Sequence, residues 1–306
     1  MAGLNEIVER LQQELGPMAG PPEPLEGGIT NRNYRVTLGE REYVVRVPGK
    51  DTALLGIRRD AERIANAAAA ELGIAPAVAA ADDDCLVTHF VLCDPIDTDQ
   101  LRAAPDGVAR ALRAFHDSGL QLPVRFWVPE LLASYARIVG ERGGTLPARY
   151  ALAQDVARQI ADVLPLSDPV PCHNDLLAAN LLMVVGSDGA GEPANVILVD
   201  WEYAGTGHRL FDLGNLAVNN EFDEAAEERL LTAYYGAPPG PGLLAALRLM
   251  RIMSDAREGA WGVVQGVISE LDFDFEEYAA THFERLARAA GDPRFAEGLA
   301  TASVAP

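Results

Sequence analysis

The chain has 306 residues, a formal net charge of −20 at pH 7, and fractions of 49% hydrophobic and 23% charged residues. This composition is ordinary for a globular protein, and the length allows a large core divided between two lobes. Because nucleic-acid binding needs a basic surface that neutralises phosphates, the acidic excess argues against that class and is compatible with a small cationic substrate.

The N-terminus and the cysteines indicate a compartment. Residues 1–10 contain neither the basic segment nor the apolar segment of a signal peptide, and no apolar run in the sequence has the length of a membrane span. The three cysteines, Cys85, Cys93 and Cys172, lack the spacing of a metal site. We therefore expect a cytoplasmic protein with reduced thiols and no membrane partner.

The first part of the chain has the pattern of a small lobe with about five strands and one main helix. Apolar residues at helical spacing predict a short amphipathic helix over residues 4–15, and an alanine-rich segment predicts the main helix over 56–72. Alternating side chains and turn residues predict strands on both sides of Gly27-Gly28 and over 41–47, 77–80 and 86–91.

The second part has almost wholly helical periodicity. We expect a loop over 171–180, a hairpin over 181–199, and helices over 106–117, 129–141, 148–163, 210–219, 223–235, 241–266 and 275–290. An antiparallel β-rich lobe followed by a helical lobe is typical of an α+β, bilobal protein-kinase-like fold. We place a nucleotide-binding lobe at residues 1–92 and a helical catalytic and substrate lobe at 93–306.

One polar pattern points to a reaction. In residues 172–182, Asp175 follows His173 by two positions, and Asn180 follows in the same loop. Further along, the apolar run 196–199 ends in Asp200. An Asp that accepts a hydroxyl proton, with an Asn and a second Asp that hold Mg²⁺, are the groups that phosphoryl transfer from a nucleotide requires. The pattern therefore predicts a phosphotransferase.

The motifs together resemble those of a known family. They are Gly27-Gly28-Ile29-Thr30-Asn31, Arg59-Asp60-Ala61-Glu62, His173-Asn174-Asp175 with Asn180, Asp200-Trp201-Glu202-Tyr203-Ala204, Phe211-Asp212-Leu213-Gly214-Asn215 and Trp261-Gly262-Val263-Val264-Gln265. From Gly27 to about Leu286 the chain is similar to the choline/ethanolamine kinase branch of the aminoglycoside-phosphotransferase-like superfamily. The resemblance implies a kinase that uses ATP and Mg²⁺.

The nucleotide candidates lie in the first lobe. A turn at Gly28 lets backbone amides approach phosphates, and Thr30 and Asn31 add side-chain donors. The resemblance places Arg46 where protein kinases carry a phosphate-binding lysine, paired with Glu62 on the following helix. The backbone of the segment from Thr88 to Val91 would meet the adenine edge, with His89 itself an exposed strand residue.

The catalytic candidates lie in the second lobe. Asp175 would accept or orient the proton of the acceptor hydroxyl, and Asn180 and Asp200 would hold the metal ion. His173 would orient the loop backbone or, alternatively, carry a proton. Glu202 would contact a metal-bound water, pair with an arginine of its own loop, or contact the substrate. Asp212 and Asn215 would tether the loop, and His116 would be a hydrogen-bonded core residue.

The substrate candidates follow from the resemblance. Trp261 and Tyr278 match two positions of an aromatic cage for a quaternary ammonium group, and Phe275 lies near a third. The chain departs from the family at Glu258, where a tryptophan is usual, and at Asn219-Asn220, where a Glu-Trp pair is usual. A smaller cage with an added carboxylate suits a primary amine or a larger polar amino alcohol. The alternative is that Trp261 and Phe275 only pack helices.

Three functions follow, and the sequence leaves the exact acceptor and the choice between ATP and GTP open. The first is a kinase that phosphorylates the hydroxyl of a small choline- or ethanolamine-like amino alcohol. The second is an O-phosphotransferase that modifies an aminoglycoside or macrolide antibiotic. The third is a catalytically silent kinase-like binding protein, which the joint presence of Asp175, Asn180, Asp200, Arg46 and Glu62 disfavours.

Overall fold

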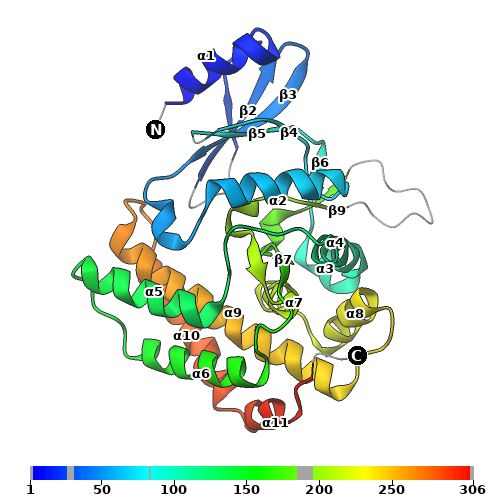
Figure 1. Ribbon diagram of the computed structural model, residues 1–306, viewed down its shortest axis with the longest axis vertical. Coiled ribbons are helices and arrows are strands. Elements are labelled where there is room, and N and C mark those ends of the chain that lie inside the picture. The colour runs from blue at the N-terminus through cyan, green and yellow to red at the C-terminus, as the bar shows by residue number, and fades with distance from the viewer. Residues whose placement is uncertain (1–2, 26–30, 83, 185–195, 304–306) are drawn as a thin grey trace.

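A computed structural model describes residues 3–25, 31–82, 84–184 and 196–303 of the chain. An antiparallel sheet with two helices forms the N-terminal part, and helices dominate the rest of the chain (Figure 1). The predicted α+β class is confirmed. The division at residues 92 and 93 stays a prediction.

The N-terminal sheet has the strand order β1-β2-β3-β5-β4, and each neighbouring pair is antiparallel. Its strands are β1 (Glu23–Leu25), β2 (Asn31–Leu38), β3 (Arg41–Pro48), β4 (Val78–Ala81) and β5 (Leu86–His89). The predicted turn between β2 and β3 is present, with Gly39 in the left-handed region at φ 60°. The expected five strands are therefore confirmed in the described part of this lobe.

Helix α1 (Leu4–Leu15) covers one face of this sheet. Its buried side chains Ile7, Val8 and Leu11 pack against strand residues that include Val36 and Val45. The helix has the bounds that its apolar spacing predicts. Its contacts with β2 anchor the N-terminal segment on the sheet.

Helix α2 (Arg59–Glu71) joins the sheet to the helical part. Its buried alanines Ala61, Ala65 and Ala69 recur at a spacing of one helical turn, and their small side chains permit close packing. The helix begins later than the predicted residue 56, because Gly56 is left-handed at φ 84° and closes a short 3₁₀ turn, Thr52–Leu55.

The rest of the chain contains the predicted helices together with two short helices that the periodicity did not indicate, α3 and α11. Their bounds are α3 (Thr98–Ala103), α4 (Asp106–His116), α5 (Val128–Glu141), α6 (Arg149–Val163), α7 (Arg209–Asn219), α8 (Glu224–Tyr235), α9 (Pro241–Ile268), α10 (Phe275–Ala290) and α11 (Pro293–Thr301). Helices α3 and α11 escaped prediction because segments of 6 and 9 residues are too short to give a clear period.

Short strands frame the loop at 171–180. Strand β7 (Val170–Cys172) pairs with β10 (Gly205–Gly207), and a second small sheet has the order β6-β8-β9, with β6 at Cys93–Pro95, β8 at Leu181–Val184 and β9 at Val196–Leu198. The predicted β8–β9 hairpin is confirmed in its strands, while its turn lies outside the described residues. Two 3₁₀ turns, Ala178–Asn180 and Trp201–Tyr203, contain the candidate residues Asn180 and Glu202, and Asp200 directly precedes the second turn.

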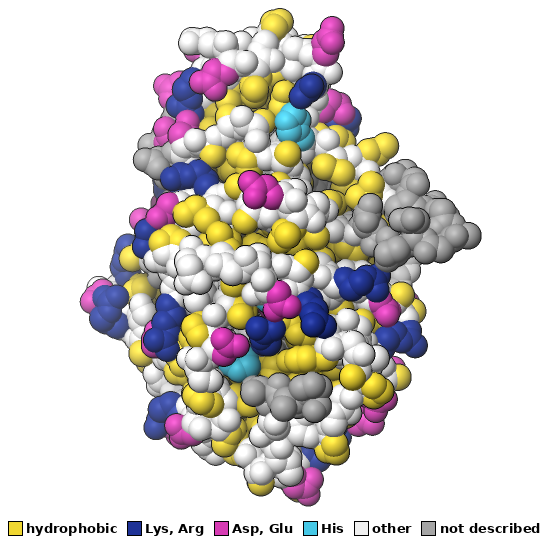
Figure 2. Space-filling model, turned by 45° about the vertical axis from the view of Figure 1, so that its right-hand side comes forward, with side chains coloured by type: hydrophobic (Ala, Val, Ile, Leu, Met, Phe, Trp, Pro, Cys, Tyr) yellow, Lys and Arg dark blue, Asp and Glu magenta, His cyan; other side chains and the backbone are white. Residues whose placement is uncertain are grey.

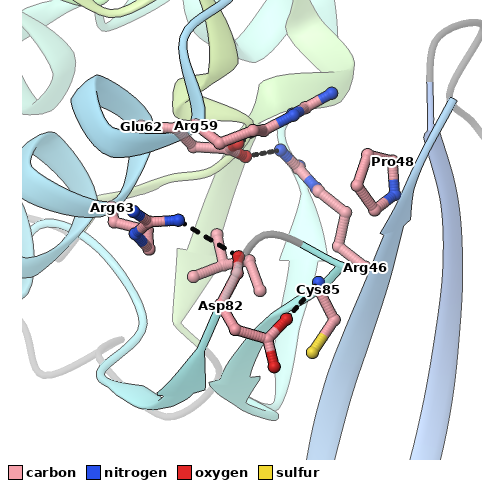
Figure 3. A pocket seen from close by; sticks show the side chains of 8 residues that line it. Arg46, Pro48, Arg59, Glu62, Arg63, Asp82 and Cys85 are labelled. Carbon is pink, nitrogen blue, oxygen red and sulfur yellow. Dashed lines mark hydrogen bonds and ion pairs between the residues drawn. The ribbon is translucent and has the colours of Figure 1, made fainter. Parts of the chain in front are cut away.

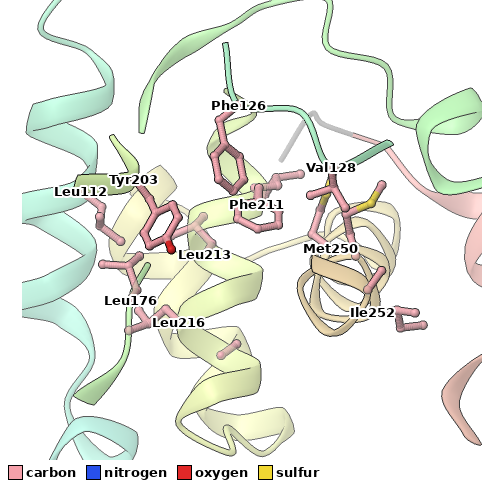
Figure 4. Packing of buried hydrophobic residues seen from close by; sticks show 14 of the residues in the cluster. Leu112, Phe126, Val128, Leu176, Tyr203, Phe211, Leu213, Leu216, Met250 and Ile252 are labelled. Atoms are coloured by element: carbon pink, nitrogen blue, oxygen red, sulfur yellow. The ribbon is translucent and has the colours of Figure 1, made fainter. Parts of the chain in front are cut away.

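Helix α9 is the centre of the helical part, and it packs against α5, α6, α7, α10 and α11. Helices α7 and α9 cross closely at Gly214, where a Cβ atom would lie 2.7 Å from the backbone carbon of Met250. Figure 4 shows Phe211 of α7 beside Met250 of α9, while Leu216 of α7 lies on the side of Leu112 and Leu176. This packing fixes the helices that carry the candidate site.

Two surface properties complete the description. Although α9 has 28 residues, neither it nor another helix of the described ranges is both long and apolar enough to cross a membrane. On the face shown in Figure 2, acidic and basic side chains are interspersed and do not form one patch of a single sign.

Candidate functional site

A cavity of about 700 Å³ lies between the N-terminal sheet and the helical part. Strand residues such as Val44, Leu86 and Thr88 line one end, and Tyr203 and Trp261 line the other. The cavity brings together ten residues that the sequence predicts for the site: Arg46, His89, Val91, Asp175, Asn180, Asp200, Glu202, Glu258, Trp261 and Tyr278.

Arg46 on β3 lines this cavity. Its Nη1 lies 2.7 Å from Oε1 of Glu62 on α2 and 2.7 Å from Oδ1 of Asp200. The expected pair with Glu62 is therefore present, and Figure 3 shows its geometry. Burial alone would lower the pKa of Arg46, but the charges of Asp200 and Glu62 raise that pKa above its usual value. The guanidinium therefore stays charged where phosphates would bind.

Glu202 contacts the N-terminal lobe. Its Oε2 accepts a hydrogen bond of 2.8 Å from Nδ2 of Asn31 and lies 3.4 Å from Nη1 of Arg59 on α2. The arginine partner comes from α2, and not from the loop of Glu202 as one expectation had it. Burial and the charge of Asp200 raise the pKa of Glu202 to about 7. Asn31 and Glu202 thus connect the two lobes beside Asp200.

Asp175 and Asn180 lie at opposite ends of the loop that follows β7. Nδ2 of Asn180 donates to the backbone carbonyl of Asp175 at 2.9 Å and to its Oδ2 at 3.3 Å. Nη1 of Arg257 lies 3.4 Å from Oδ1 of Asp175. Burial is the main reason why the pKa of Asp175 is raised to about 8. The charge of Arg257 lowers this pKa, and the charges of Glu258 and Asp200 raise it. This carboxylate has the environment of a proton acceptor.

His173 has a different environment. Its Nδ1 accepts the backbone N–H of Asp175 at 3.3 Å, and its Nε2 lies 3.0 Å from the carbonyl of Val199. The ring is buried beside Trp201, and burial lowers its pKa. His173 is not part of the cavity lining formed by described residues. These contacts favour the orienting role over the proton-carrying role.

Asp212 on α7 holds the start of the loop. Its Oδ2 and Oδ1 accept the backbone N–H groups of His173 at 2.8 Å and Asn174 at 2.7 Å, and His116 lies 3.0 Å away through Nε2. Asn174 is left-handed at φ 67°, which Asn tolerates better than most residues. Asn215 accepts the N–H of Leu176 at 2.6 Å. The expected tethers and the core role of His116 are confirmed by these contacts.

The donor set at Asn180 and Asp200 fits Mg²⁺. The Nδ2 of Asn180 is engaged with Asp175, which leaves the amide oxygen as the atom for a metal ion. Asp200 lines the same cavity and contributes a carboxylate. Its backbone is left-handed at φ 66°, an uncommon conformation that is concentrated at functional sites. Amide and carboxylate oxygens are the ligands that Mg²⁺ prefers.

The sheet end of the cavity has the character of a base-binding site. The backbone N–H groups of His89 and Phe90 are bonded to the carbonyls of Ala77 and Glu42, both at 2.9 Å, which leaves Val91 as the next amide along this edge. His89 is half-buried, and its ring packs at 5.1 Å from that of Tyr43. Its side chain is thus more covered than the exposed strand residue expected. Gly28 and Thr30 lie outside the described residues.

Aromatic residues of α9 and α10 line the other end. The ring of Trp261 lies 5.5 Å from that of Tyr278, and its Nε1 donates to the hydroxyl of Tyr203 at 2.7 Å. Phe275 packs at 5.9 Å from Trp261 but does not appear in the cavity lining, and neither does Asn219, within the described ranges. We therefore interpret Phe275 as a support for Trp261.

Arg257 is the main residue of the site that the sequence analysis missed. It precedes Glu258 on α9, is buried with 1% of its surface exposed, and lines the cavity. Its guanidinium carbon lies 4.3 Å from the ring centroid of Tyr203, and Nη1 lies 2.7 Å from Oε1 of Glu258. An arginine inside a largely apolar helix was the available signal, since such a residue is rarely buried without function or partner.

The family follows from a comparison with known proteins. Residues 22–249 match the model of the phosphotransferase enzyme family called APH, and the chain therefore belongs to this family. The match spans the sheet, the catalytic loop, Asp200 and the start of α9. The resemblance that the motifs predicted is confirmed for the phosphotransferase family.

Relatives and solved structures agree with that assignment. "Probable choline kinase 1" of Arabidopsis thaliana is 24% identical over 86% of this chain and 84% of its own length. A choline/ethanolamine kinase family protein from Mesorhizobium loti is 27% identical, with a TM-score of 0.78 over 96% of this chain and 98% of its own. The choline kinase LicA of Streptococcus pneumoniae has a TM-score of 0.77 at 23% identity, covering 94% and 99%. The kinase-like fold is thereby confirmed.

Proposed function

We propose that this chain transfers the γ-phosphoryl group of ATP, in the presence of Mg²⁺, to the hydroxyl group of a small amino alcohol. The main support is that one cavity is lined by Asp175, Asn180, Arg46 and Asp200. Arg46 forms ion pairs there with Glu62 and Asp200. In phosphoryl transfer the base contacts the acceptor hydroxyl, while the metal ligands and the cation contact the phosphates of the nucleotide. Membership of the phosphotransferase family supports the reaction type.

Asp175 would orient the acceptor hydroxyl and take up its proton as the oxygen attacks the γ-phosphorus. Asn180 donates to both the backbone and the carboxylate of Asp175, so the acid is held in one position. His173 and Asp212 fix the loop backbone on either side and act as positioning residues. Phosphoryl transfer gains most of its rate from such positioning and from charge stabilisation.

Arg46 would bind the nucleotide phosphates, with Glu62 holding its guanidinium in place. Asn180 and Asp200 would hold Mg²⁺, which neutralises phosphate charge when it is bound. Thr88 and Val91 would meet the base at the sheet end of the cavity. In this arrangement Asn31 and Glu202 keep the two lobes in register.

The acceptor would lie between Asp175 and the aromatic pair of Trp261 and Tyr278. The face of an indole attracts an ammonium group, which favours an amino alcohol over an uncharged alcohol. The names of the Arabidopsis and Streptococcus relatives, both choline kinases, point to the same compound class. Glu202 and Glu258 line the cavity as well, and both are already paired with arginines.

A coupled assay of ADP release tests the proposal. Purified protein with Mg·ATP is offered ethanolamine, choline, an aminoglycoside and a macrolide, each at several concentrations. Turnover that depends on the amino alcohol supports the proposal, and turnover only with the antibiotics supports the antibiotic phosphotransferase instead. Binding of Mg·ATP without turnover on these acceptors or on other amino alcohols, hydroxy-amino acids included, would indicate a silent kinase-like protein.

A further inference from the structure

The acceptor end of the cavity already contains a cation. The guanidinium of Arg257 lies over the face of Tyr203 at 4.3 Å, which is the geometry of a cation–π contact. The same group lies between two carboxylates, at 2.7 Å from Glu258 and 3.4 Å from Asp175. An arginine of the protein itself therefore has the contacts that an ammonium group of a substrate would seek.

The carboxylates that line the cavity are each close to a guanidinium. Asp200 contacts Arg46, and Glu202 contacts Arg59. Glu258 is saturated, because Oε1 faces Arg257 and Asn215 while Oε2 accepts the hydroxyl of Tyr278 at 2.9 Å. Among the described residues, the guanidinium closest to Asp175 is that of Arg257 at 3.4 Å, and the carboxylate also accepts a hydrogen bond from Asn180. Its charge is needed for the acceptor proton. The described lining of the cavity therefore offers a substrate with a fixed positive charge no carboxylate that lacks a guanidinium neighbour.

Arg257 itself has hydrogen-bonding capacity to spare. Its Nε and Nη2 are buried and have no hydrogen-bond partner among the described residues. Leaving the N–H groups of a buried charged side chain unpaired is costly, and such groups in folded proteins usually meet a ligand or a water. The planar guanidinium matches the two oxygens of a carboxylate in particular.

We propose that Arg257 binds a carboxylate of the acceptor, so that the substrate is a zwitterionic amino alcohol, a hydroxy-amino acid, and not a net cation such as choline. This inference rests on the proposed function and specifies its substrate class. The ammonium group would lie against Trp261 and Tyr278, the carboxylate against Arg257, and the hydroxyl at Asp175. Such a molecule brings a negative group for Arg257 and a positive group for the aromatic pair to a cavity whose described lining holds four carboxylates and two guanidiniums.

Matched acceptors that differ only by a carboxylate provide the test. Serine is compared with ethanolamine, homoserine with 3-aminopropan-1-ol, and carnitine with (2-hydroxypropyl)trimethylammonium, by kcat/KM at saturating Mg·ATP. We expect the carboxylated member of at least one pair to exceed its partner about tenfold or more, as a charge-assisted hydrogen bond implies. Preference for the carboxyl-free member in every pair would overturn this inference but would leave the proposed function valid. Lack of turnover with all six would overturn the proposed function and this inference with it.

Variants of Arg257 show whether this residue causes the preference. Arg257 also contacts Asp175, so Arg257→Met should change kcat/KM for both members of a pair. The diagnostic effect is on their ratio: we expect the preference for the carboxylated acceptor to fall roughly ten- to a hundredfold, with little change in the KM of ATP. Arg251→Met is the matched control, because Arg251 also lies on α9 and pairs with the buried Glu227, outside the cavity lining. Glu227 keeps Arg248 in that control.

Loss of one partner of a buried ion pair can prevent folding, so a second variant accompanies the first. The double variant Arg257→Met/Glu258→Gln removes both charges of the closest pair, so that the Glu258 carboxylate is not left buried without its arginine. Retained Mg·ATP binding shows that either protein is folded. An equal loss of kcat/KM for both members of a pair in the folded variants would mean that Arg257 has a structural role, and the inference would be wrong.

Discussion

Arg46 of the N-terminal sheet and Asp200, which follows strand β9 in the helical part, form an ion pair at 2.7 Å. The pair joins the expected phosphate-binding cation to an expected metal ligand. Since Arg46 also contacts Glu62, one guanidinium connects a strand, a helix and the loop proposed to bind the metal ion. Changes to either residue should therefore alter nucleotide binding and the stability of the lobe contact together.

Removal of the Asp200 carboxylate should weaken Mg²⁺-dependent nucleotide binding. Asp200→Ala takes a full negative charge from the proposed metal site and leaves Arg46 with Glu62 alone. We expect a loss of roughly tenfold or more in affinity for Mg·ATP, measured by calorimetry, and a larger loss in turnover. Asp200→Asn keeps an oxygen ligand, so its affinity for Mg·ATP should lie between those of the unchanged protein and Asp200→Ala. Unchanged Mg·ATP affinity in Asp200→Ala would contradict the metal-ligand assignment.

Asp175 should affect turnover without affecting the nucleotide. Asp175→Ala removes the proposed proton acceptor, and we expect a rate loss on the order of 10²–10⁴ with nearly unchanged Mg·ATP affinity. Glu141→Ala is the control for loss of a carboxylate, since Glu141 is exposed on α5 and pairs only with Arg137 in the described contacts. A variant at Asp175 that keeps more than about a tenth of the rate would place the base elsewhere.

The tether at Asp212 should contribute to both rate and stability. Asp212→Asn keeps the shape of the side chain but can accept only one of the two backbone N–H groups of His173 and Asn174 through its carbonyl oxygen. We expect a lower melting temperature and a reduced kcat with a nearly constant KM for ATP. The melting temperature would come from calorimetry and kcat from the ADP assay. A change in stability with kcat unaltered would mean that the loop holds its position without this tether.

The sequence was most informative where chemistry requires a fixed spacing. The loop from His173 to Asn180 and Asp200 after its strand could be predicted because the reaction restricts residue type and order. The Arg46–Glu62 pair was predicted from the family resemblance. The long helices and the five-stranded sheet could be predicted because their periods extend over several turns or strand pairs.

The acceptor end could not be predicted in the same way. The sequence indicates that Glu258 and Trp261 share a helix face, but it does not reveal that the neighbouring Arg257 reaches across to Glu258 and Asp175. That contact depends on how α9 crosses the catalytic loop, which is a property of tertiary packing. Likewise, Asn219 and Phe275 were assigned to the substrate by position alone, and the packing places both outside the cavity lining.

Trp261 should affect the acceptor more than the nucleotide. Trp261→Ala removes the indole face, and we expect the KM of an amino alcohol to rise roughly five- to thirtyfold while the KM of ATP changes little. Trp261→Phe keeps an aromatic face but loses the hydrogen bond to Tyr203, so it separates stacking from positioning. If both variants only lower the melting temperature and leave the acceptor KM unaltered, Trp261 is a packing residue.

His208 should make folding stability depend on pH. Its Nδ1 accepts the N–H of Leu210 at the start of α7, and burial, followed by the charges of Arg209 and His116, lowers its pKa to about 4. The unfolded chain binds a proton at this residue below its ordinary pKa of 6.5, whereas the folded chain does not until near pH 4. Since the unfolded state then binds more protons, stability falls as the pH decreases through this window, by about 2 kcal/mol at pH 5.

His208→Asn tests this assignment, because asparagine is a good helix N-cap that does not titrate. Urea unfolding of both proteins from pH 7.5 to pH 4.5 should show a smaller loss of unfolding free energy with acidification in the variant. The difference between the two curves should begin near pH 6.5 and grow towards pH 4, as the lowered pKa requires. Parallel curves would mean that the folded protein accommodates a charged His208, and the acid sensitivity would then come from other groups.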